Sequence, residues 1–222
     1  MKKLLEIFVL LTLVLFVSAC SNTASGERPG TATPAKTEVE VTEETPLVVN
    51  VSEKTLSVYA TVNGKYLFEP TRHGLNFHEG KFGNQAIFVA HANPLDFHDA
   101  LVSLGAEPGN NLGSHSDEHI IKGESVEITI TWEGAQREYS IDEVILDSQG
   151  KAVDQRFGGN FESAKSAFTG CLMCLDSCTV GITSNSSHEL KSFDDKKVEF
   201  KGNPEILPED GTPVIVKFTI VD

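Results

Sequence analysis

Short apolar runs, separated by polar or glycine-containing breaks, dominate the chain from residue 46 onward. Some runs alternate apolar with polar residues, which is typical of half-buried β-strands, and others are continuous, as in buried strands. The alternation is clearest at 126–132, and the strongest β segment is 213–221. We therefore expect strands at 46–51, 55–62, 85–90, 126–132, 136–141, 152–157, 179–183, 197–200 and 213–221.

One segment has a helical period instead. Asn93 suits an N-cap, Pro94 suits the first helical position, and Gly105 is placed to end the helix. Between them, four apolar residues recur at i, i+3, i+4 and i+7: Phe97, Ala100, Leu101 and Leu104. The sequence thus predicts one helix at about 94–104. Since strands outnumber it and do not alternate with helices, we expect an α+β fold with a mainly antiparallel sheet.

The first 19 residues have the layout of a secretory signal. Lys2 and Lys3 precede an apolar stretch, 7–17, that is too short to span a bilayer, which needs about 20 residues. The following Val17-Ser18-Ala19-Cys20 resembles the lipobox of bacterial lipoproteins. That resemblance implies cleavage before Cys20 and attachment of acyl chains to it. An ordinary secretory signal with a chance cysteine is the alternative.

Residues 20–45 are rich in Ser, Thr, Ala, Pro, Gly and Glu, so they predict a lipidated, disordered tether. A single globular domain, 46–222, is expected to follow it. The predicted location is the bacterial cell envelope, extracytoplasmic, with the membrane as a partner through the lipid anchor. Ser21 replaces the Asp that often marks inner-membrane retention, which favours the outer membrane where there is one. Nothing in the pattern names a protein partner.

The formal net charge is −14, from 18 basic and 32 acidic residues. This balance excludes nucleic acid as an expected partner, because phosphates require a basic face. The chain also lacks a nucleophile elbow, a phosphate-binding loop, a His-Glu-x-x-His motif and a dinucleotide fingerprint. We therefore expect a non-enzymatic protein.

Three cysteines, Cys171, Cys174 and Cys178, are the strongest chemical signal in the sequence. Their spacing would place three thiolates within reach of one centre if they lie on a tight loop or a first helical turn. Such donors suit zinc, copper(I) or an iron–sulfur cluster. A fourth ligand would come from elsewhere; His188 is the nearest histidine in sequence, and His73 is a further candidate.

Two other interpretations of the cysteines stay open. In the first, two of them form a local disulfide and the third is a spare thiol, in a structural or partner-binding domain. In the second, Cys171 and Cys174 exchange disulfides, with Cys178 as the resolving thiol. Asp176 and the acidic composition oppose the thiolate that this activity requires.

Three features follow one another along the chain: a strand running into the helix and its tail, a hairpin, and a closing strand. Their residues are 86–90, Pro94, Ala100-Leu101, Gly105-Ala106 and Pro108-Gly109, then Thr131-Trp132, Gly134 and Arg137, then Gly211-Thr212-Pro213-Val214. In this order they resemble the YdjY-domain family of bacterial secreted proteins. A cysteine-bearing branch of that family also shares Gly170-Cys171, Cys174, Cys178 and Val180-Gly181-Ile182. The resemblance covers about 54–221 and implies a shared fold, but no established activity; some members are labelled ferredoxin-like from the cysteine spacing.

Overall fold

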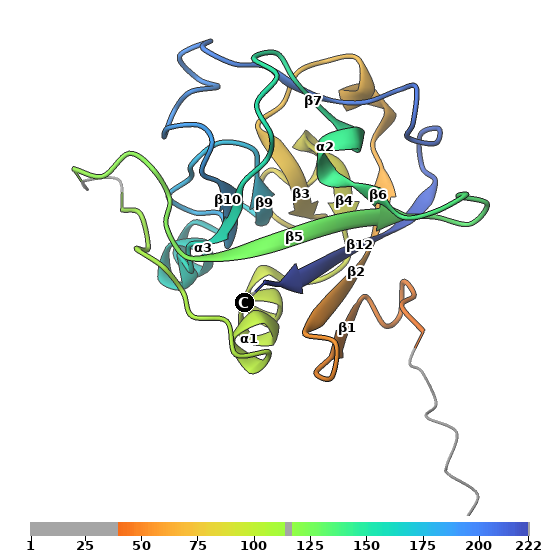
Figure 1. Ribbon diagram of the computed structural model, residues 1–222, viewed down its shortest axis with the longest axis horizontal. Helices are drawn as coiled ribbons and strands as arrows, with labels where there is room; N and C mark the ends of the chain where they lie inside the picture. Colours follow the sequence, from red (N-terminus) through yellow and green to blue (C-terminus); the bar gives the residue numbers. More distant parts are fainter. Residues whose placement is uncertain (1–39, 114–116, 222) are drawn as a thin grey trace, which may run out of the picture. The chain divides into compact units, whose positions relative to one another are not determined.

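The computed structural model describes residues 40–113 and 117–221, which are mostly β-structure (Figure 1). The predicted signal peptide, Cys20 and most of the predicted tether lie outside these residues. The strands are β1 (Leu47–Asn50), β2 (Thr55–Val62), β3 (His73–Phe77), β4 (Ala86–Ala90), β5 (Glu124–Thr131), β6 (Tyr139–Ser140), β7 (Ile145–Asp147), β8 (Gln155–Phe157), β9 (Cys171–Cys174), β10 (Thr183–Asn185), β11 (Phe200–Gly202) and β12 (Pro213–Ile220). The α-helices are α1 (Pro94–Ser103), α2 (Ile141–Val144) and α3 (Phe161–Ala167), and the 3₁₀ helices are η1 (Gly64–Leu67) and η2 (Gly83–Gln85).

The main sheet closes on itself. Its strands follow the order β2, β12, β5, β8, β10, β9, β3 and β4, and β4 then pairs with β2 to complete an 8-strand barrel. Two of these neighbouring pairs run parallel, β3–β4 and β9–β10, and the others run antiparallel. β1 lies beside the first half of β2, β6 pairs with β5, and β7 pairs with β11 as a separate ribbon.

The predicted α+β class is therefore wrong. The fold is mostly β, with a closed barrel and small helices that hold 16% of the described residues. The error comes from β3 and β9, which lie between β4 and β10 in the barrel wall and were not among the predicted strands. Without these two strands the apolar runs describe an open sheet.

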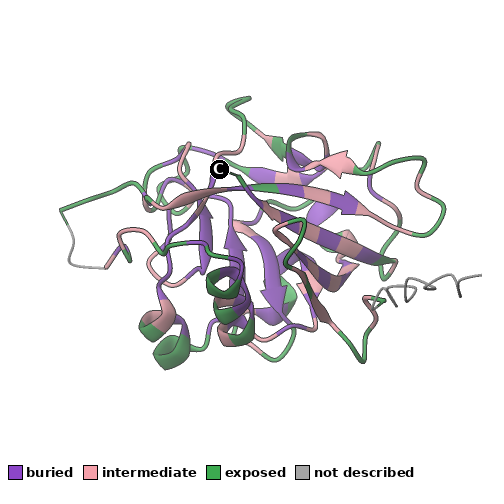
Figure 2. Cartoon of the chain, turned by 60° about the horizontal axis from the view of Figure 1, so that its bottom comes forward, coloured by how far each residue is buried: buried purple, intermediate pink, exposed green. Residues whose placement is uncertain are grey.

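The long strands carry the alternation that their sequences predict. In β2 and β12 every second residue is buried, and Figure 2 shows this alternation along the ribbons. The register places buried residues of neighbouring strands opposite one another: Phe218 of β12 faces Leu56 of β2 on one side and Ile128 of β5 on the other. All three are at most 3% exposed, so the apolar core fills the barrel between these strands.

The predicted helix is confirmed as α1. The Asn93 side chain accepts a hydrogen bond from the backbone N–H of Leu95 at 2.8 Å, which caps the helix as expected. Phe97 and Leu101 are fully buried, and the Phe97 ring packs edge-on against Phe218, 4.8 Å between centroids. In the part of the chain that the structure describes, no helix has the length and apolar character needed to cross a bilayer.

Candidate functional site

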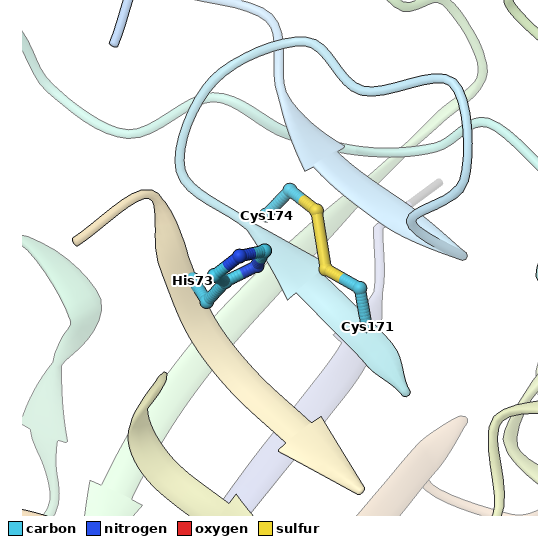
Figure 3. A group of neighbouring side chains, drawn as sticks. All are labelled: His73, Cys171 and Cys174. Atoms are coloured by element: carbon cyan, nitrogen blue, oxygen red, sulfur yellow. A yellow bond between two sulfur atoms is a disulfide. The ribbon is translucent and has the colours of Figure 1, made fainter. Parts of the chain in front are cut away.

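Strand β9 positions two of the three cysteines. An extended strand separates residues i and i+3 by about 10 Å, but the Cα atoms of Cys171 and Cys174 are 6.5 Å apart, so β9 is sharply bent. Its partner β3 follows this bend with two register shifts. The bend brings both sulfur atoms together, and they form a disulfide (Figure 3). The first two cysteines of the motif therefore lie on a strand, and Cys178 lies on the loop that follows it, whereas the spacing had suggested one tight loop or helical turn for all three.

Cys178 completes a cluster of three cysteines that is separate from the main apolar core. The three cysteines form one buried cluster against which Val180 packs, and each cysteine is at most 4% exposed. The Cys178 sulfur lies outside the group of ligand atoms of His73, Cys171 and Cys174 that are within 4.8 Å of one another. Cys178 is a free thiol. Burial raises the pKa of this thiol, although the Arg72 guanidinium and the backbone N–H groups of Val180 and Gly181 oppose the rise. The net effect is a raised pKa, so the thiol is protonated at neutral pH.

His73 is the histidine that reaches the cysteines. It lies on β3 opposite Cys174 of β9, and Figure 3 shows its ring beside the disulfide. Ligand atoms of His73, Cys171 and Cys174 all lie within 4.8 Å of one another, and this is the one such group of potential metal ligands among the described residues. The Nδ1 atom of His73 is buried without a hydrogen-bond partner. Burial, and then the charge of Arg72, lower the imidazole pKa to about 4.

His188, the nearest histidine in sequence, is engaged elsewhere. Its Nε2 atom lies 2.5 Å from a carboxylate oxygen of Asp147, and its ring packs edge-on against Phe200. The side chains of His188 and Asp147 are 2% and 5% exposed, so they form a buried pair. The structure therefore brings His73, and not His188, into the group with Cys171 and Cys174.

An ion pair that the sequence did not reveal holds the cysteine loop in place. Arg72 donates to Asp176 through Nε at 3.1 Å and through Nη2 at 2.7 Å, and its Nη1 donates to Asp194 at 2.8 Å. The other carboxylate oxygen of Asp176 accepts from the backbone N–H of Phe193. Asp176 is thus neutralised by Arg72 and does not face the cysteines as an isolated negative charge. No local pattern marks this pair, because Arg72 and Asp176 are 104 residues apart in sequence.

The site leaves no room for a side chain at Gly181. A Cβ atom placed on this residue would lie 2.7 Å from the Cys174 sulfur, closer than real Cβ contacts. Asn160 fixes the same turn from the other side, donating from Nδ2 to the carbonyl oxygens of Cys178 and Gly181, both at 2.9 Å. The loop that covers the sulfur cluster is therefore held at both of its ends.

The family model for the YdjY domain matches residues 47–219, which include the barrel strands and all three clustered cysteines. The chain belongs to the YdjY domain family. It is 41% identical over 179 residues to the Escherichia coli (strain K12) protein named "Uncharacterized protein YdjY", and the match covers 80% of each chain. No solved structure matches this YdjY domain. The resemblance inferred from the sequence is confirmed.

Proposed function

We propose that this YdjY domain binds a thiophilic metal ion in its reduced form. Cys171, Cys174 and Cys178 supply thiolates, and His73 supplies an imidazole nitrogen. The observation that supports this most directly is the unpartnered, buried Nδ1 of His73 in a ring whose ligand atom lies within 4.8 Å of two sulfur atoms. A buried nitrogen with no partner is costly for a fold to maintain, and a metal ion would satisfy it.

The donor set fits zinc or copper(I). Three thiolates and one imidazole form a common four-coordinate set for zinc, and soft sulfur donors also select copper(I). An iron–sulfur cluster is the less favoured occupant, because the signal lacks a twin arginine and so favours export of an unfolded chain, away from cluster assembly. Two of the four proposed donor atoms, the sulfurs of Cys171 and Cys174, are bonded to each other in a disulfide, so metal binding requires its reduction.

Metal uptake by the reduced protein tests this proposal. The full chain, reduced and kept without oxygen, is loaded with zinc or copper(I), desalted and analysed by metal quantification. We expect about one metal ion per chain, with loss of most of it in Cys174→Ser. Cys20→Ser is the matched control, because it removes a cysteine outside the cluster and should leave the metal content unchanged. Equal metal content in Cys174→Ser and in the unaltered chain would contradict the proposal.

A structural disulfide with one spare thiol remains the second candidate, because the structure contains the Cys171–Cys174 bond. It predicts that the reduced protein takes up no metal and that the denatured protein has one free thiol at Cys178. Exchange with protein substrates is disfavoured. Cys171 and Cys174 are 1% and 0% exposed, so neither sulfur can be reached by a disulfide on another protein surface.

We further propose that Cys20 anchors the domain to a membrane of the bacterial cell envelope, on its extracytoplasmic side. The lipobox-like residues 17–20 support this. Several acyl chains on one residue give stable attachment, so Cys20→Ser should move the protein almost entirely from the membrane fraction to the soluble fraction. Fractionation with fatty-acid labelling measures the effect. Cys178→Ser should remain in the membrane, and a membrane-bound, labelled Cys20→Ser protein would refute lipidation at this residue.

A further inference from the structure

A cavity of about 440 Å³ lies next to the sulfur cluster. Its polar wall includes Arg72, His73 and Cys178, and its apolar wall includes Phe82, Val180 and Phe193. Cys171 and Cys174 are not among its lining residues. Of the three cysteines, Cys178 is therefore the one in contact with both the cavity and the disulfide.

We infer that this cavity admits a low-molecular-weight thiol and that Cys178 relays it to the Cys171–Cys174 disulfide. The inference rests on the proposed function, since reduction of this disulfide frees the metal ligands. The cavity volume is in the range that holds a small molecule but no protein loop. The cavity lining also includes Lys191 and Asp194, whose carboxylate pairs with Arg72, so the walls carry both signs of charge for a zwitterionic amino-acid thiol such as cysteine.

Three groups around Cys178 would partly offset the cost of a negative charge on its sulfur during exchange: the backbone N–H groups of Val180 and Gly181, which donate to it, and the Arg72 guanidinium. Burial outweighs them and raises the pKa of the thiol, so Cys178 loses its proton only as it attacks. Gly181 also contacts the Cys174 sulfur, because a Cβ there would be 2.7 Å from that atom. Cys174 is therefore the bonded cysteine that Cys178 would attack.

The exchange proceeds in three balanced steps. The Cys178 thiolate attacks the Cys174 sulfur, a Cys174–Cys178 disulfide forms, and Cys171 leaves as a thiolate that takes up the proton Cys178 released. A small thiol in the cavity then attacks the Cys178 sulfur, giving a mixed disulfide and the Cys174 thiol. A second small thiol releases the small disulfide and restores the Cys178 thiol. In sum, two small thiols are oxidised to one disulfide and the Cys171–Cys174 bond is reduced.

The test follows the reduction of the oxidised full chain by free cysteine, using alkylation and peptide mapping. We expect a mixed disulfide with cysteine on Cys178, and a rate at least about tenfold lower in Cys178→Ser. Leu190→Trp, which fills the cavity from its wall, should also slow the reaction, whereas Val102→Trp on the exposed face of α1 should not. Cysteine coupled to dextran should react poorly with every variant.

Two results would overturn the relay: an unchanged rate in Cys178→Ser, or adducts that form directly on Cys171 or Cys174. Metal loading of Leu190→Trp after borohydride reduction separates the two proposals. If the relay is wrong but metal binding is right, Leu190→Trp and Val102→Trp bind metal, Cys178→Ser does not, and free cysteine reduces the disulfide at the same rate in all variants. If metal binding is wrong but the relay is right, the rates of reduction differ between the variants and no reduced protein retains metal.

Discussion

Replacing Arg72 by methionine is expected to lower the free energy of unfolding by about 3–5 kcal/mol. The Asp176 side chain is fully buried, and Arg72 supplies its counter-ion through two hydrogen bonds. Removing the guanidinium leaves a buried carboxyl group whose remaining hydrogen bond comes from the backbone of Phe193. Urea unfolding of the chain carrying Cys20→Ser, which lacks the proposed acylation site, measures the loss.

Asp194→Ala is the matched control for Arg72→Met. It removes the other carboxylate that pairs with the same arginine, but its side chain is 55% exposed, so the expected loss is below about 1 kcal/mol. The double variant Arg72→Met, Asp176→Leu should recover much of the stability lost in Arg72→Met, because no charge is then left buried. Equal losses in Arg72→Met and Asp194→Ala would show that burial of Asp176 does not set the cost.

The sequence predicted the parts of the fold that local patterns encode. Strands β2, β5 and β12 have one buried face each, so their alternation is visible in the sequence. Helix α1 carries a capping residue and an apolar stripe, which are likewise local. What these patterns cannot encode is which strands pair, and the contact between β2 and β4 that closes the barrel depends on pairing alone.

The two barrel strands that were not predicted, β3 and β9, have compositions that hide them. β3 contains His73, Gly74 and Asn76, which read as a polar turn, yet four of its five residues are buried. A Cβ on Gly74 would lie 2.2 Å from the terminal methyl carbon of Met173 on the neighbouring strand, so the Met173 side chain would have to move to admit one. β9 is buried throughout, so its apolar run has no period that distinguishes a strand from a loop or a helix.

The candidate site was predictable only in part, because it depends on strand pairing as well as on local sequence. The three cysteines lie within eight residues, so their gathering in one cluster was expected, although on strand β9 it depends on a bend that the spacing does not encode. The histidine beside them is supplied by the register between β3 and β9, which places His73 opposite Cys174 across about a hundred residues of chain. Sequence distance favoured His188 instead, and the fold pairs that ring with Asp147.

His73 is also expected to make the metal-free, oxidised protein sensitive to mild acid. Burial and the neighbouring Arg72 lower its pKa from 6.5 to about 4. Between these values the unfolded chain takes up a proton at His73 and the folded chain does not, so stability falls as the pH falls. The free energy of unfolding is expected to be about 3 kcal/mol lower near pH 4 than well above pH 6.5 because of this one histidine. Urea unfolding of the Cys20→Ser chain at a series of pH values measures it.

The comparison with His73→Asn isolates this effect. That variant should lose much of the pH dependence of stability between pH 6.5 and 4, whereas His119→Asn, at an exposed position, should keep it.

Two carboxyl groups also make stability depend on pH. Arg137 and Ser140 lower the pKa of the Glu143 carboxyl group to about 2, so its contribution to stability is lost at lower pH than that of His73, as the pH falls below about 4.5. Burial raises the pKa of Asp176, which favours the folded state in acid and is common to all three proteins. A curve for His73→Asn that coincides with the unaltered one would mean that His73 is protonated in the folded barrel, and that its buried nitrogen has a partner after all.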